Sequence, residues 1–142
     1  MNVILKIFML ALWVLFASVM NAASKTQTLL DQLGLAQSME QATPIVEELW
    51  KEWTGGHRNE DEKALMTQGI AAMSKGNLDQ AEILFTKLIE VNPDFTEAWN
   101  KRATLRFMAW DFEGSLKDVE KVLALEPRHF GALSGLGMIH LR

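Results

Sequence analysis

Apolar side chains recur every three or four residues through most of the chain after Ser24, and no segment there alternates apolar and polar residues as a strand does. This spacing predicts helices. The first is expected over residues 25–37. The second is expected to begin with Thr43 as its N-cap and Pro44 as its first helical residue, and to end at Gly55.

Five further helices are predicted downstream, separated by short polar breaks, over residues 60–74, 78–91, 96–109, 112–125 and 130–142. Three carboxylates open the first of them, which suits the positive end of a helix dipole. Pro93 and Pro127 each end a helix, and they stand 34 positions apart in similar surroundings. The pattern therefore predicts two helix–turn–helix units of one length and the beginning of a third.

The residues that recur with this period resemble the tetratricopeptide repeat family, whose pattern is W-x2-L-G-x2-Y on one helix, A-x3-F on the next and a closing proline. The matching positions are Leu65, Gly69, Ala81, Phe85 and Pro93, then Trp99, Ala103, Ser115, Val119 and Pro127, then Leu133, Leu136 and Gly137. The Leu position of the pattern holds Gln68 and Arg102, and the Tyr position holds Ala72, Arg106 and His140. The resemblance covers 62–142 and implies an all-α, short right-handed helix–turn–helix solenoid, preceded by a signal peptide.

The same resemblance implies that the first helix of each repeat lines a concave face that binds a peptide or protein. The expected groove residues are Met66, Ile70, Met73, Asn100, Lys101, Thr104, Phe107 and Met108, with Ser134, Met138 and Leu141 from the third repeat. Methionine suits irregular peptide-binding surfaces, but methionine at helical spacing also packs in cores, and that alternative stays open. The Lys and Asn arrangement with which some members clamp a C-terminal carboxylate is not visible, which argues against that ligand in the groove.

The first residues have the order of a secretory signal peptide: Lys6, then the apolar run 7–19, then the small residues Ala22 and Ala23. An uncleaved membrane anchor is the alternative, since a span takes ~20 residues. The chain also resembles, more loosely, a group of exported bacterial repeat proteins without an assigned activity. We expect 1–23 to be the signal peptide or N-terminal anchor, 24–58 a helical leader and 60–142 the repeat region.

Composition and charge exclude several classes of site and partner. The chain has no cysteine, so it offers neither disulfides nor a thiol nucleophile, and its formal net charge of −4 argues against nucleic acid as a partner. His57, His129 and His140 lack the spacing of metal ligands. The glycines near the end of the chain follow no predicted strand, so no nucleotide or other cofactor is expected. Lys101, Arg102 and Arg106 form a basic strip for which a solvated or salt-bridged face is the default interpretation.

These observations predict a non-enzymatic, exported adaptor of the tetratricopeptide type that binds a protein or peptide. Three alternatives remain, one of which is an enzyme or an enzyme's accessory domain beyond Arg142. The apolar segment 130–142 and the Trp50 and Trp53 of the leader suit a self-associating or membrane-tethered scaffold, with membrane contact only if the first segment is uncleaved. Repeat arrays normally end in a helix with a polar outer face, so the chain is also expected to be the N-terminal fragment of a longer repeat protein.

Overall fold

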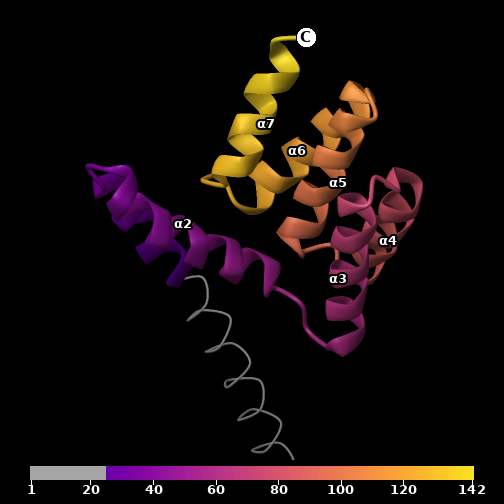
Figure 1. Ribbon diagram of the computed structural model, residues 1–142, viewed down its shortest axis with the longest axis horizontal. Helices are drawn as coiled ribbons and strands as arrows, with labels where there is room; N and C mark the ends of the chain where they lie inside the picture. Colours follow the sequence, from indigo (N-terminus) through magenta and orange to yellow (C-terminus); the bar gives the residue numbers. More distant parts are fainter. Residues whose placement is uncertain (1–24) are drawn as a thin grey trace, which may run out of the picture. The chain divides into compact units, whose positions relative to one another are not determined.

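The computed structural model describes residues 25–142, and the predicted signal segment lies outside them. Every regular element in that range is a helix, which confirms the all-α prediction (Figure 1). Residues 25–35 are helical, and the later helices are α2 Met39–Thr54, α3 Glu60–Ser74, α4 Leu78–Val91, α5 Thr96–Met108, α6 Phe112–Leu125 and α7 Phe130–His140. Over the described range, none of these helices has the length and hydropathy needed to cross a membrane.

The chain divides into two compact units, one up to Glu52 and one from Trp53 to Arg142. In the first unit, the Lys25 ammonium joins the helix 25–35 to α2, because Nζ lies 2.7 Å from Glu48 Oε1 and also contacts Glu52 Oε1. The bond to Glu48 raises the pKa of Lys25, and the same bond lowers the pKa of the Glu48 carboxyl.

The start of α2 differs from the prediction. The helix begins at Met39 rather than at Pro44, which lies inside it. Ser38 Oγ accepts a hydrogen bond from the Gln41 N–H at 3.3 Å, as an N-cap does. Thr43, the predicted cap, instead donates from Oγ1 to the Met39 carbonyl at 2.7 Å. The earlier Ser-x-x-Gln sequence, a capping-box pattern, therefore starts the helix. Pro44 lies in its second turn, where it has no N–H to donate to the Glu40 carbonyl.

The second unit consists of two antiparallel helix pairs and one further helix. α3 packs on α4 and α5 on α6, while α4 packs on α5 and α7 on α6 (Figure 1). The first helices of successive repeats also touch, α3 against α5 and α5 against α7. The predicted helix–turn–helix pairs are therefore present, with a third repeat represented by α7.

Each pair closes through a small residue on its first helix. At Gly69 a Cβ atom would lie 2.6 Å from Cε1 of the Phe85 ring, so only glycine fits there. One period later the same positions hold Ala103 and Val119, which lie together in a second core cluster. A smaller side chain on one helix is thus matched by a larger one on its partner, as close packing requires.

The two turns within the pairs have the same hydrogen bonds but different residues. In the first, the Gly76 N–H donates to the Met73 carbonyl at 3.0 Å, and the Asn77 N–H to the Ala72 carbonyl at 3.0 Å. This is a Schellman closure, which places its central residue in the left-handed region, and Gly76 has φ 74°. The second turn repeats both bonds 34 residues later, but there the left-handed residue is Trp110, with φ 66°.

Candidate functional site

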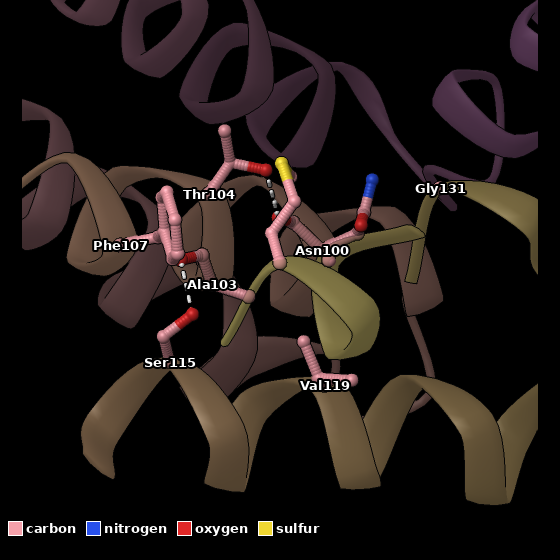
Figure 2. A pocket seen from close by; sticks show the side chains of 9 residues that line it. Asn100, Ala103, Thr104, Phe107, Ser115, Val119 and Gly131 are labelled. Carbon is pink, nitrogen blue, oxygen red and sulfur yellow. Dashed lines mark hydrogen bonds between the residues drawn. The ribbon is translucent and has the colours of Figure 1, made fainter. Parts of the chain in front are cut away.

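A cavity of ≈ 50 Å³ lies among α5, α6 and α7 (Figure 2). The predicted groove residues Asn100, Thr104 and Phe107 line it, and so does Met138 of the third repeat. The rest of the wall comes from Ala103, Ser115, Val119, Gly131 and Gly135. The structure therefore gathers part of the predicted set around one small depression.

The hydroxyl groups of this wall face the backbone. Thr104 Oγ1 donates to the Asn100 carbonyl at 2.9 Å, and Ser115 Oγ donates to the Ala103 carbonyl at 2.8 Å (Figure 2). Both hydroxyl protons are thus taken up by backbone carbonyls, one within α5 and one between α6 and α5, and what remains at the cavity is largely apolar surface. Such a wall suits an apolar side chain better than a charged one.

One buried amide is held in a defined orientation beside the cavity. Asn100 is 6% exposed, and its Nδ2 donates to both carboxylate oxygens of Glu97, at 3.2 and 3.1 Å. Only the nitrogen end of the amide can donate to a carboxylate, so the oxygen end is turned away from Glu97. Among residues 25–142, Oδ1 has no hydrogen-bond partner, and it is therefore an acceptor open to an incoming N–H.

Glu97 is itself fixed by a histidine from the next repeat. Both side chains are fully buried, and Glu97 Oε2 lies 3.2 Å from His129 Nε2. His129 Nδ1 accepts the Ala132 N–H at 3.2 Å and so caps α7, which leaves the ring proton on Nε2, directed at Glu97. Lys101 Nζ lies 2.9 Å from the other oxygen, and the imidazole stacks on Trp53 at 3.9 Å between ring centroids. The histidine is thus a structural element that supports the site.

The other predicted groove residues have different places. Met66 is 4% exposed and belongs to the hydrophobic core, and Ile70 and Met73 pack half-buried against the same core. The methionines of α3 therefore lie as the alternative interpretation expected, packed in or against the core. Lys101 is committed to Glu97, and Met108 is half-exposed at a second depression beyond the end of α5.

The basic strip of α5 is salt-bridged and largely buried. Arg102 forms a bidentate pair with Asp118 of α6, with both N–O distances at 2.8 Å, and also donates to Thr86 of α4. Arg106 bonds the same carboxylate at 3.0 Å and Glu82 of α4 at 2.9 Å. These arginines replace the apolar and aromatic residues of the family pattern, and they join α4, α5 and α6.

The second depression was not predicted. It has a volume of ≈ 150 Å³ and is lined by Phe107, Met108, Trp110, Phe112 and Arg142. The sequence does carry a signal for it, because Trp110 stands where the preceding repeat has Gly76. Elsewhere in the described range, no three His, Asp or Glu side chains are grouped as a metal ion requires.

Comparison with curated proteins agrees with the helix pairs. The chain is 36% identical over 123 residues to a TPR repeat-containing protein of Rhizobium etli, over 84% of this chain and 60% of that protein. The chain carries tetratricopeptide repeats. Over 66 residues it is 38% identical to tetratricopeptide repeat protein 36 of Mus musculus and 36% identical to that of Homo sapiens, each match covering 46% of this chain.

This tetratricopeptide chain spans 60% of the Rhizobium relative and 36% and 35% of the mouse and human relatives. No family model matches it. The named relatives support a protein-interaction repeat scaffold, because helical repeats of this kind form extended binding surfaces.

Proposed function

We propose that this protein is a non-enzymatic scaffold that binds an extended segment of another protein across α5 and α7. The observation that supports the proposal is the cavity beside Asn100, where an apolar wall meets the amide oxygen of this largely buried residue, which has no hydrogen-bond partner in the described chain. Extended peptides offer that combination, with side chains to fill pockets and backbone N–H groups to donate.

The geometry defines what such a segment presents. The cavity of ≈ 50 Å³ accepts the end of a single apolar side chain, against Phe107, Val119 and Met138. A neighbouring backbone N–H donates to Asn100 Oδ1, which the bond to Glu97 holds in place without further ordering. Met138 adjusts to different apolar side chains because methionine has several rotatable bonds.

The proposed compartment is outside the cytoplasm. It is supported by the order of Lys6, the apolar run 7–19 and the small residues that follow. Fusion of residues 1–24 to a reporter that is active only after export tests this part alone, and a reporter that stays inactive contradicts it.

A second candidate function is a scaffold that associates with itself through α7. It is favoured by the exposure of Leu133 and Met138, each 48%, and of Leu141, 87%. Sedimentation velocity over a wide range of concentrations tests it. A single monomeric species throughout rejects self-association and leaves the peptide-binding proposal intact.

The test of the groove uses a photo-crosslinking amino acid at Thr104, which lies at the cavity and is exposed. The matched control carries the crosslinker at Glu90, exposed on α4. Crosslinking in cells and mass spectrometry should yield a protein partner at Thr104 that is absent at Glu90. Equal adducts at both positions, or none at Thr104, reject the groove as the binding site.

Two glycines of α7 provide a matched pair of variants for any partner so found. A Cβ at Gly135 makes ordinary contact with Val119 at 3.7 Å, so Gly135→Leu keeps the packing and fills the cavity. A Cβ at Gly137 meets nothing within 4 Å, and Gly137→Leu leaves the cavity open. Both changes raise helix propensity alike. Loss of the partner with the first variant and not the second is the expected result, and equal binding by both contradicts the proposal.

A further inference from the structure

The turn between α5 and α6 holds a bulky residue in a backbone conformation that its counterpart reserves for glycine. Trp110 is the only non-glycine residue with positive φ in the described chain. Gly76 occupies the same place in the first repeat, and the same two hydrogen bonds close both turns. Bulky L-residues are disfavoured there, so the backbone of the turn does not favour a tryptophan at this position. Strain retained in a stable turn points to a role for the side chain.

The Trp110 side chain contributes to an exposed aromatic surface. It is 72% exposed, and its ring meets Phe112 edge-on, with the centroids 5.8 Å apart. Phe112 in turn lies 5.3 Å from the ring of Phe107, and Met108 beside them is half-exposed. These four residues and Arg142 line the depression of ≈ 150 Å³, which we call the Trp110 surface.

One cation on the Trp110 surface is not paired with a carboxylate. The Arg142 guanidinium lies over the Trp110 ring, with Cζ 5.6 Å from the centroid, and has no carboxylate partner within residues 25–142. The neighbouring carboxylates are engaged. Asp111 caps α6 and lies 3.9 Å from Arg106, and Glu113 lies 2.7 Å from Lys117.

We propose that the Trp110 surface is a second binding site, separate from the groove, for a protein segment that presents an apolar side chain next to an acidic one. The apolar side chain fills the depression between Trp110, Phe112 and Met108. The acidic side chain pairs with Arg142, whose planar guanidinium suits a carboxylate in two parallel hydrogen bonds. Stacking on Trp110 keeps that guanidinium in place before the partner arrives.

An anionic bilayer is the other surface that attracts tryptophan next to arginine. Asp111 lies between Trp110 and Phe112 in the chain, and Glu113 follows directly, 82% exposed at its side chain. Insertion of the aromatic rings would bring both carboxylates to the anionic headgroups, where they are repelled. A protein segment that approaches from the side of Arg142 avoids this repulsion.

The test is a selection of random peptides displayed on phage against the whole chain, followed by affinity measurements on the free peptides. Trp110→Gly removes the ring and restores the residue that the first turn accepts, so it preserves the fold. Peptides with an acidic residue beside an aliphatic or aromatic one are expected. Arg142→Gln should weaken them about tenfold or more, as loss of a charge-assisted bond does. Trp110→Gly should weaken them to a similar extent, because it removes the ring that lines the depression and stacks on Arg142.

Two controls separate this site from the groove and from the charge of the chain. Gly135→Leu fills the cavity beside Asn100 and should leave these peptides bound, and Lys117→Gln removes a neighbouring cation that is already paired. Peptides lost with Gly135→Leu but insensitive to Trp110→Gly would support the groove and overturn the second site. A selection without acidic peptides overturns it too. Sedimentation with phosphatidylserine vesicles that depends on Trp110 would replace it by a membrane surface.

Discussion

Replacing Trp110 by glycine and by alanine separates the strain of its backbone from the contribution of its ring. Both variants lose the ring and its contacts with Phe112 and Arg142 to the same extent. They differ in the backbone, because alanine keeps a Cβ at φ 66° and glycine does not.

The magnitude follows from two opposing terms. A residue with a Cβ atom is less stable in the left-handed backbone region than in the right-handed one by ~1–2 kcal/mol. Glycine loses more chain entropy on folding, which offsets about 0.4–1 kcal/mol of that gain. Trp110→Gly should therefore be more stable than Trp110→Ala by about 1 kcal/mol. Helix interiors show the opposite order, since alanine is favoured there.

Thermal unfolding followed by circular dichroism at the helix band measures this difference, because the helix signal does not depend on the Trp110 ring that both variants lack. A difference of ~1 kcal/mol corresponds to a separation of about 4–8 °C in Tm for a domain of this size. Gly76→Ala provides the reciprocal case and should be destabilised by a similar amount, because Gly76 has φ 74°. If Trp110→Ala is as stable as Trp110→Gly or more so, the turn is not strained, and its backbone then gives no reason to assign a role to the Trp110 side chain.

Three other perturbations test the packing and the ion pairs. Asp118→Ala removes a carboxylate that two arginines of α5 share in the interior, and urea unfolding should show a loss of about 3–5 kcal/mol. Gly69→Ala places a Cβ 2.6 Å from the Phe85 ring, and should lower the free energy of unfolding by about 1–3 kcal/mol. Lys25→Gln removes the bond that lowers the Glu48 pKa. That bond stabilises the folded chain at neutral pH, and the stabilisation is lost as the pH falls below 4.5 toward the lowered pKa. The stability of the variant should therefore depend less on pH in this acid range.

Each of these predictions has a control within the chain. Lys117→Ala breaks an exposed pair and should leave the urea midpoint unchanged, and an equal effect of Asp118→Ala would show that burial does not matter. Phe85→Val in combination with Gly69→Ala reproduces the pairing of Ala103 with Val119, so the double variant should lose less than the sum of the single ones. If the losses of the two single variants simply add in the double variant, a Cβ at position 69 does not clash with the Phe85 ring. For Lys25→Gln, an unchanged acid transition would show that the contact to Glu48 contributes nothing.

The helix pairs were predictable because local signals agree there. Prolines 93 and 127 end helices, and Asn77 and Asp111 cap the next ones with their side chains, as their residue types favour. The start of α2 was missed because two capping signals compete. The pair Thr43–Pro44 is a strong local pattern, yet Ser38 offers a cap one turn earlier and lengthens the helix.

The candidate site was predictable only where it follows the repeat. Asn100, Thr104 and Phe107 line the cavity, and they were expected in the groove from the resemblance to the tetratricopeptide family. The orientation of Asn100 depends on Glu97, and Glu97 depends on His129, 32 residues away in the chain. No periodicity connects these side chains, so the bonds that fix the amide appear only when α5 and α7 are in contact.

The arginines of α5 also determine which helix can stand next to which. Asp118 of α6 receives Arg102 and Arg106, whereas one period earlier α4 carries Leu84 at that position. A copy of α4 put in place of α6, by gene shuffling or by exchange between two molecules, would leave both guanidinium groups without this carboxylate and bring a phenyl ring to Ala103. The two repeats share a backbone plan but are not interchangeable parts. The side chains that meet between the helices determine which helix can pack against which.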